Sequence, residues 1–228
     1  MPMSSPLQTL ISTLDAELSR ISLRPSRINP RWTFLPDSSL NSSSSTSTIE
    51  SSVKSYAQHL TSTLASPARI LPSSPDSVRY IPIYESVETE TLPEYEICLF
   101  YVPPKKSIPL HDHPDMIVYS SLLSGDLCVT QIDGRGWFSF LSPHKPRVFD
   151  AKVNELLKTF PKRNNLHQFE TEKGCLILDV VTPGYIEGRE CTYWGEGGTV
   201  EVPEESLEDF EVKTGEIDGF ADGEGGNE

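Results

Sequence analysis

The sequence predicts a mainly β fold, an antiparallel sandwich or small barrel, with a helical extension at its N-terminus. Three observations predict it. Periodic apolar residues indicate helices ahead of residue 78, short β-rich runs separated by turn residues follow, and a Gly- and Glu-rich stretch ends the chain. At 228 residues the chain suits one domain with extensions.

Residues 1–36 form the first expected segment, with a helix from about residue 5 to 22. Its apolar residues recur at three- and four-residue spacing, which lines one helix face: Leu7, Leu10, Ile11, Leu14, Leu18 and Ile21. Residues 37–53 are Ser-rich and too polar to bury, so we expect a flexible connector there. Residues 54–77 should hold a second helix with this inner face: Val53, Tyr56, Ala57, Leu60 and Leu64.

The barrel is expected to occupy residues 78–212. Seven short runs are typical of strands: RYIPIYES, YEICLFYVP, MIVYSSLL, DLCVTQI, GWFSFL, LHQFE and CLILDVV. Gly134-Arg135-Gly136 indicates a tight hairpin, because glycine is free to take positive φ. Val153–Leu157 should form a short apolar helical patch, and residues 213–228 a disordered acidic tail.

The charge of the chain excludes two classes of partner. The formal net charge is -14, and residues 196–228 hold twelve acidic side chains against Lys213 alone. An acidic chain without a basic face lacks the counterion release that drives binding to phosphate backbones, so we expect no nucleic acid partner. The same argument weighs against an anionic membrane surface, and no apolar run reaches the roughly 18 residues of a membrane span.

The four cysteines, at positions 98, 128, 175 and 191, show no CxxC spacing, and the chain has no secretory apolar segment. We therefore expect reduced thiols in a cytoplasmic protein. The predicted location extends to the nucleus, and the predicted oligomeric state is a monomer.

Two of the five histidines lie in the strand-like stretch IPLHDHPDM. Residues i and i+2 of a strand project from the same face, so His111 and His113 can aim their imidazoles at one point, and His167 is the best candidate for a third donor. By itself an HxH pair is more often a half-exposed strand face. We expect Asp112 to point to the opposite face. Asp115 is a rival candidate for a ligand, but its place just after Pro114 favours a position at the bend after the strand.

The frame around this pair favours a metal. In the cupin pattern HxH is followed by three or four residues, an acidic ligand, six more residues and a glycine; here four residues separate His113 from Val118, and six separate Val118 from Gly125. Valine cannot bind metal, so the frame predicts three histidines without a carboxylate. Such a site keeps the full charge of a divalent ion, which favours a thiolate ligand. Iron would then serve the oxygenation of sulfur, whereas zinc would imply hydrolysis or structure.

Three blocks in order resemble the plant cysteine oxidase and cysteamine (2-aminoethanethiol) dioxygenase family. They are IPLHDHPDMIVYSSLLSGDL, then NLHQF, which is similar to GNxHxF, and CLILDVVTPGYIEGRECTYW, which is similar to CAxLDVxxPPY...GRxCTYY. The resemblance implies a non-haem Fe(II) thiol dioxygenase in a cupin (double-stranded β-helix, jelly-roll) barrel, with one iron held by His111, His113 and His167. It also implies that O2 converts a thiol to a sulfinic acid. The expected substrates are Cys-initiated protein N-termini, which feed an oxygen-dependent degradation route, and some members also act on cysteamine.

The last block carries four further site residues. The resemblance implies that Asp179 and Tyr185 shape the substrate pocket, and that Cys191 and Tyr193 match a pair that forms a thioether cross-link in some members. Plainer interpretations remain open: Asp179 as a buried structural carboxylate, Tyr185 as the cap of a turn, and the Cys191 and Tyr193 pair as ordinary core. The chain also departs from the family pattern, because Asp115 and Gly184 replace a glycine and a proline.

Two alternative functions stay open beside the peptide oxidase. One is a dioxygenase of a small free thiol such as cysteamine. The other is a non-catalytic metal-binding cupin that holds zinc or no metal and binds a partner or small ligand.

Overall fold

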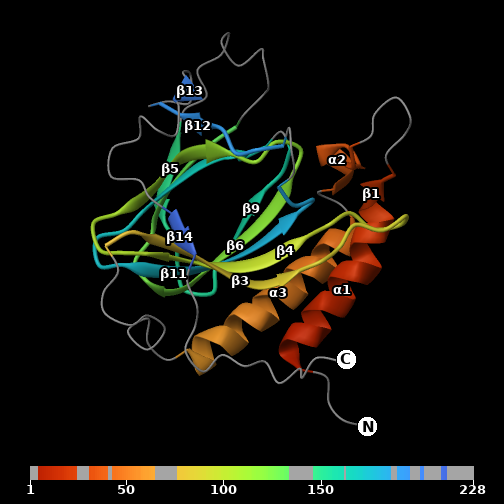
Figure 1. Ribbon diagram of the computed structural model, residues 1–228, viewed down its shortest axis with the longest axis horizontal. Helices are drawn as coiled ribbons and strands as arrows, with labels where there is room; N and C mark the ends of the chain where they lie inside the picture. The colour runs from red at the N-terminus through yellow and green to blue at the C-terminus, as the bar shows by residue number, and fades with distance from the viewer. Residues whose placement is uncertain are drawn as a thin grey trace.

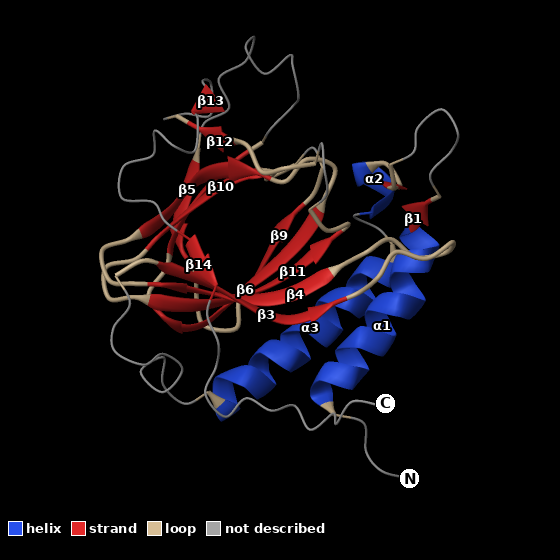
Figure 2. Cartoon of the chain, in the orientation of Figure 1, coloured by secondary structure: helices blue, strands red, loops and turns tan. Residues whose placement is uncertain are grey.

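The computed structural model describes residues 5–24, 31–40, 43–64, 76–133, 146–161, 163–185, 189–195, 201–202 and 212–214 (Figure 1). Two six-stranded sheets face each other, and two long helices lie along the outside of one of them (Figure 2). None of the described helices has the length and hydropathy needed to cross a membrane.

The first sheet has the strand order β13-β12-β5-β10-β7-β8. Its strands are β5 (Ser107–Asp112), β7 (Cys128–Ile132), β8 (Arg147–Asp150), β10 (Leu166–Glu170), β12 (Tyr193–Trp194) and β13 (Glu201–Val202). All of its described pairings are antiparallel.

The second sheet has the order β14-β3-β4-β11-β6-β9. Its strands are β3 (Val78–Glu85), β4 (Glu96–Val102), β6 (Ile117–Gly125), β9 (Leu156–Thr159), β11 (Cys175–Thr182) and β14 (Val212–Thr214). Only β14 pairs in parallel among its described strands. Two facing sheets with strands that alternate between them confirm the predicted mainly β, double-stranded β-helix barrel with a helical extension.

The helical layer follows the predicted periodicity. Helix α1 (Pro6–Ile21) begins after Ser5, whose side chain accepts a hydrogen bond from the Gln8 backbone N–H at 3.1 Å. Its apolar stripe is buried against α3 (Ser44–Thr63) and the outer face of the second sheet. The short α2 (Asp37–Leu40) and the pair β1 (Ser22–Leu23) and β2 (Thr33–Phe34) lie between the two long helices in the chain.

The prediction of a flexible connector over residues 37–53 is wrong, because this stretch contains α2 and the first half of α3. Ile49 and Val53 are fully buried in the core, and the Thr46 hydroxyl donates to the Leu40 carbonyl at 2.8 Å. Short hydroxyl side chains can be buried when backbone carbonyls accept their hydrogen bonds, so the polar composition concealed a helix. The second helix therefore begins earlier than predicted, and it ends at Thr63.

Two other segment predictions need correction. The helical patch expected over Val153–Leu157 is wrong, because Leu156 begins β9, which pairs with β6. A disordered tail was expected from residue 213, but residues 213 and 214 belong to β14, which pairs with β3. The rest of that tail, and the hairpin expected at Gly134-Arg135-Gly136, lie outside the described residues.

Gly125, the glycine of the cupin frame, ends β6 with a φ of 90°. A Cβ atom at this position would collide with the backbone carbonyl oxygen of Gly174. Glycine is needed here for both reasons, and it lets the end of β6 close against the turn before β11.

The space between the sheets is divided into two halves. The apolar half is a buried cluster from both sheets that includes Val102, Leu122, Val129, Phe169 and Ile177. The polar half contains buried polar side chains from the same strands or their neighbours: His111, His113, Ser120, Gln131, Thr159, His167 and Asp179. The candidate site lies in the polar half.

Candidate metal centre

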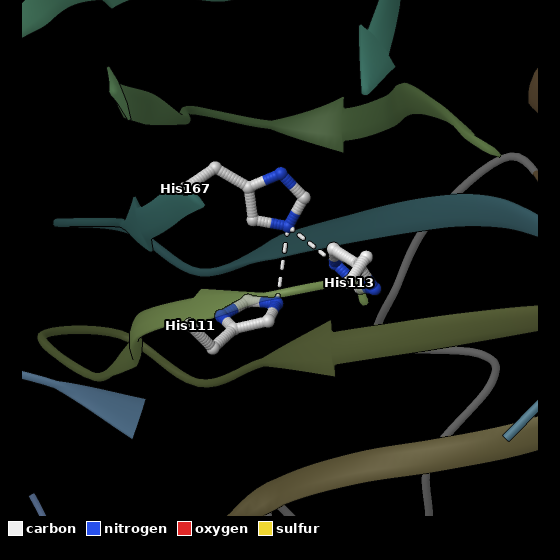
Figure 3. Close-up of side chains that lie close together, drawn as sticks. All are labelled: His111, His113 and His167. Atoms are coloured by element: carbon white, nitrogen blue, oxygen red, sulfur yellow. Dashed lines mark hydrogen bonds between the residues drawn. The ribbon is translucent and has the colours of Figure 1, made fainter. Parts of the chain in front are cut away.

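Three histidines converge in the polar half of the barrel (Figure 3). His111 on β5 pairs directly with His167 on β10, and His113 follows two residues after His111. The Nε2 atom of His167 lies 3.1 Å from Nε2 of His111 and 3.1 Å from Nε2 of His113. Among the described residues this is the group of His, Cys, Asp and Glu side chains whose ligand atoms are close enough to share a metal ion.

The other nitrogen of each ring has a separate partner. Nδ1 of His111 lies 2.7 Å from the Pro109 carbonyl oxygen, Nδ1 of His167 lies 3.3 Å from the Thr159 hydroxyl, and Nδ1 of His113 lies 2.7 Å from the Tyr185 hydroxyl. A carbonyl oxygen can only accept, so Nδ1 of His111 carries the proton in the neutral ring and its Nε2 keeps a lone pair. Partners of this kind orient the imidazoles that bind metal.

Burial keeps all three rings neutral. Each is less than 8% exposed, and desolvation lowers the pKa of His111 to about 4. Desolvation also lowers the pKa of His113 and His167 well below their ordinary value, and repulsion between the rings adds to the effect. At neutral pH the three imidazoles are therefore in the state that a metal ion requires.

The donor set fits a divalent metal ion. Two bonds of about 2.0 to 2.1 Å at right angles place their nitrogens about 3 Å apart, close to the spacing that the Nε2 atoms show. Val118 fills the position where the cupin frame carries a carboxylate, and it packs with Met116 and Val181. The donor set is thus three neutral nitrogens, which both iron and zinc accept.

The two acidic residues around His113 are not ligands. The Asp112 carboxylate accepts a hydrogen bond from the Thr192 backbone N–H at 3.0 Å, so it holds the segment before β12 on the opposite face, as predicted. Asp115 sits at the predicted bend with a φ of 56°, in a turn closed by the Met116 N–H and the His113 carbonyl. This left-handed backbone explains why glycine suits the position in the family pattern.

Asp179 lies in the polar half on β11, opposite Cys98 of β4 and Ser120 of β6. It is 4% exposed, and desolvation raises its pKa to about 7, although a hydrogen bond from Ser120 opposes the shift. Its Oδ1 atom has no hydrogen-bond partner among the described residues. A buried carboxyl oxygen without a partner is costly, which makes Asp179 a candidate for binding a ligand.

Tyr185 connects the histidine cluster to the surface, because its side chain is 42% exposed while its hydroxyl contacts His113. Desolvation raises the pKa of the phenol, and the nearby Cys191 and Asp179 raise it further, so the phenol stays protonated. Tyr185 therefore contacts Nδ1 of His113, the ring nitrogen that faces away from the cluster. The sequence had predicted that Tyr185 lines the substrate pocket or caps a turn, but not this contact.

A buried ion pair holds the segment that carries Tyr185. Arg189 is 1% exposed, and its Nη1 donates to Glu94 Oε1 at 3.0 Å and to the Gly184 carbonyl at 2.9 Å. The Gly184 N–H donates in turn to the Glu94 carbonyl at 3.2 Å. Sequence reasoning missed both Arg189 and Thr159; the only signal for Arg189 was its place in the GRECTYW block.

The remaining two candidates lie beside the cluster. Tyr193 on β12 pairs with His111 on β5, with ring centroids 6.2 Å apart. Cys191 is half-buried, and its Sγ lies 4.0 Å from the Thr192 carbonyl. A cross-link between Cys191 and Tyr193 stays a prediction.

Comparison with known proteins gives one matching family. The family model PCO_ADO matches residues 40–217, which is most of the chain. Plant cysteine oxidase 2 of Arabidopsis thaliana is 32% identical over 116 residues, covering 44% of this chain and 40% of that protein. A probable 2-aminoethanethiol dioxygenase of Dictyostelium discoideum is 30% identical over 123 residues, covering 49% and 54%.

A human 2-aminoethanethiol dioxygenase is 28% identical over 152 residues, covering 54% of each chain. The chain thus spans about half the length of the curated relatives it matches. Among solved structures, a protein with a double-stranded β-helix domain from Klebsiella pneumoniae has a TM-score of 0.36 at 18% identity, covering 57% of this chain and 93% of that chain. An oxalate oxidase in complex with glycolate has a TM-score of 0.39 at 16% identity, covering 53% and 57%.

Proposed function

The chain belongs to the PCO_ADO family, and from this premise we propose that it is a non-haem iron thiol dioxygenase that converts the N-terminal cysteine of a protein or peptide to cysteine sulfinic acid with O2. One observation carries the proposal. Three buried, neutral imidazoles meet at their Nε2 atoms without a carboxylate. They do so in a chain whose relatives are named cysteine oxidases and 2-aminoethanethiol dioxygenases.

His111, His113 and His167 would hold the iron. Bound iron supplies the electron exchange with O2 that zinc cannot, and its positive charge lowers the pKa of a thiol next to it. The hydrogen bonds on the far side of each ring fix the direction of the three Nε2 lone pairs. Because Val118 replaces a carboxylate ligand, the described residues offer no carboxylate among the metal ligands to compete with the substrate thiolate for that charge.

Asp179 is the residue suited to bind the substrate amine. An N-terminal cysteine carries an ammonium group two carbons from its sulfur, and Asp179 Oδ1 is a buried acceptor that lacks a partner among the described residues. A hydrogen bond between charged groups contributes about 1.5 to 3 kcal/mol. Desolvation raises the pKa of this carboxyl to about 7 in the protein alone, and an ammonium bound to it would favour the ionised form.

Tyr185 acts at the entrance. Its protonated phenol binds His113 while its ring reaches solvent, so the site opens to solvent beside this side chain. The ion pair of Arg189 with Glu94 keeps the segment in place, because it bonds the residue immediately before Tyr185. A fixed wall of this kind positions sulfur and limits the access of water.

The choice of a peptide over cysteamine rests on the exposed ring of Tyr185, because a site that opens to solvent can admit the end of a longer chain. Cysteamine has the same spacing between nitrogen and sulfur, so Asp179 would accept either substrate. We infer further that the protein is a monomer of the cytoplasm and nucleus, where oxidation of Cys-initiated proteins would lead to oxygen-dependent degradation. Sedimentation and cell fractionation test these two inferences.

Oxygen uptake by the iron-loaded full chain tests the main proposal. A Cys-initiated peptide should consume O2 and gain two oxygen atoms by mass spectrometry, while the matched Ser-initiated peptide and zinc-loaded protein should be inactive. Faster turnover of cysteamine than of the peptide would favour the small-thiol dioxygenase. Bound iron with no O2 uptake on either substrate would favour a non-catalytic cupin.

A further inference from the structure

A cavity of about 420 Å³ lies where the edge strands of the two sheets meet, between β8 and β9. We call it the seam pocket. It is lined, among other described residues, by Gln131, Arg147, Phe149, Lys158, Phe160 and Arg163. None of these side chains belongs to the proposed metal centre.

Two guanidinium groups of the seam pocket have no anionic partner among the residues that the structure describes. Arg147 stacks on the ring of Phe149 at 4.5 Å, and Arg163 stacks on the ring of Phe160 at 4.3 Å. Neither forms an ion pair or a side-chain hydrogen bond with any residue that the structure describes. Stacking holds each guanidinium by its face and leaves its N–H edge available for an acceptor.

The remaining charged side chains of the seam pocket lower its net charge by about one unit. Lys158 is paired with Glu50 at 2.8 Å, and Glu155 also lines the pocket. The Glu155 carboxylate accepts a hydrogen bond from the Lys152 backbone N–H at 2.9 Å, so it is held at the rim. When these pairs are taken into account, about one positive charge remains, which suits a carboxylate better than a phosphate dianion.

Gln131 gives an independent sign of a ligand. Its side chain lines the seam pocket and is 4% exposed, yet it makes no hydrogen bond to a described residue. Because Gln131 is the cross-strand partner of His167, both side chains project toward the interior. The amide atoms of Gln131 are not among the described polar atoms that are both sealed from water and without a partner. They therefore face the space of the pocket, where a bound polar group can form a hydrogen bond with them.

The seam pocket and the histidine cluster share a wall. Thr159, which contacts His167 Nδ1, lies in the chain between Lys158 and Phe160, and both of these line the pocket. Gln131 lies beside His167 on the neighbouring strand. Lys158 and Phe160 project from the face of β9 opposite to Thr159. Gln131 and Leu157, in contrast, line the pocket from the interior. A peptide bound at the histidines would therefore reach the pocket past Gln131 and Leu157, and an extended chain advances about 3.3 Å per residue.

We propose that the seam pocket binds the carboxylate of an acidic side chain located a few residues after the N-terminal cysteine of the substrate, an inference that rests on the proposed function. The N–H edges of Arg147 and Arg163 receive the carboxylate, and the buried amide of Gln131 binds the backbone or carboxylate behind it. Phe149 and Leu157 pack against the methylene groups of the ligand. The pocket thereby makes the enzyme selective for acidic N-termini.

A set of peptides in which one Glu is moved along the sequence tests the selectivity. Cys-initiated decapeptides carry one Glu at each position from 3 to 8, and each is compared with its Gln counterpart on the iron-loaded chain. At one or two adjacent positions kcat/KM should be about tenfold higher for Glu, as a charge-assisted hydrogen bond provides. Equal values at every position would overturn the proposal.

Variants assign the preference to the pocket. In R147Q/R163Q the Glu and Gln peptides should react equally, and in R147E/R163E a Lys peptide should exceed its Gln counterpart at the same position. The second result cannot come from a poorly folded protein. The matched control R79Q/K173Q removes two positive charges outside the pocket lining and should keep the Glu preference. A preference that survives in R147Q/R163Q would also overturn the proposal.

A binding assay separates this proposal from the proposed function. Fluorescence anisotropy with labelled Ser-initiated peptides, which cannot be oxidised, should show about tenfold tighter binding for Glu than for Gln. Tighter binding that R147Q/R163Q abolishes, without oxidation of any Cys peptide, would keep the pocket and reject the enzyme. Oxidation of Cys peptides without any preference for Glu would keep the enzyme and reject the pocket. Competition by micromolar succinate would assign the pocket to a small carboxylate and reject the peptide.

Discussion

The two halves of the barrel interior are built by the same strands, yet they have opposite physical properties. On β10, His167 belongs to the polar half and Phe169, two residues later, to the apolar half; on β11, Ile177 and Asp179 are divided in the same way. The rings of His167 and Phe169 stack with centroids 4.5 Å apart. A single step of two residues along a strand thus separates side chains that stabilise the fold from side chains that serve the site.

The electrostatics of the polar half show what this arrangement costs. Desolvation disfavours the charged form of His111, His113, His167 and Asp179, and Asp179 keeps an oxygen without a described partner. In the apolar half, Ile177 and Val129 are fully buried, and each contributes about 1.5 to 3 kcal/mol by leaving water. Stability from the apolar half therefore offsets the burial of groups that only a ligand can satisfy.

The largest effect is expected from His167→Ala, which removes the nitrogen shared by both short Nε2 contacts. Bound iron should fall from about one per chain to near zero. Thiol oxidation should fall more than about 100-fold, because losing a metal ligand has a larger effect than losing a residue that only hydrogen-bonds a ligand. Metal analysis and O2 uptake measure both quantities. His59→Ala, on α3, is the control, and activity that survives in His167→Ala would show that the third ligand is another residue.

The next effect in size should come from Ile177→Ala in the apolar half. The free energy of unfolding should fall by about 2 to 5 kcal/mol, because the deletion leaves a cavity in a fully buried cluster. Urea unfolding measures the change, and the iron content of the folded protein should stay at the wild-type value. Val87→Ala, at an 81% exposed position, is the control. Loss of iron from folded Ile177→Ala protein would mean that the two halves are not independent.

A smaller effect is expected from Tyr185→Phe, which removes the hydroxyl that bonds His113 Nδ1 and leaves the ring in place. Iron affinity should fall about tenfold, at the lower end of the range for outer-shell partners, because the partners of His111 and His167 stay in place. Titration against a competing chelator measures the affinity. Unchanged affinity together with a raised KM would place the hydroxyl in substrate binding alone.

The smallest effect should be a difference in pH dependence between the two halves. In metal-free protein the folded pKa values of the three histidines lie below the ordinary value, so the unfolded chain binds more protons as the pH falls. The stabilising contribution of the three neutral histidines is therefore fully retained above about pH 6.5 and decreases toward pH 4. Asp179, whose folded pKa is raised to about 7, contributes a slope of the opposite sign between about pH 4 and 7.

His167→Ala should make this decrease shallower by removing one of the three groups, whereas Ile177→Ala should lower stability equally at each pH. Urea midpoints between pH 4 and 8 measure the slopes. The same slope in wild type and His167→Ala would contradict the assignment of the pH dependence to the cluster.

Local patterns in the sequence were enough to predict much of this molecule. The alternation of a strand places His111 and His113 on one face, and the spacing to Val118 and Gly125 predicted a cluster without a carboxylate. The helical periodicity predicted α1 because its stripe lies within one segment. The connector over residues 37–53 was predicted wrongly because composition cannot show which hydroxyls find a buried carbonyl, as Thr46 does.

The sequence by itself determined the central strands, the first helix and the shared face of His111 and His113, because these depend on periods of two and 3.6 residues that the chain carries locally. It did not determine β9, which it predicted as a helical patch. Tertiary structure alone decided that Thr159 supports His167 from the other sheet, that Arg189 meets Glu94 across 95 positions, and that Arg147 and Arg163 border one pocket. These contacts depend on how the two sheets pair and face each other. That arrangement is set by the burial of the whole core and is not encoded at any one position.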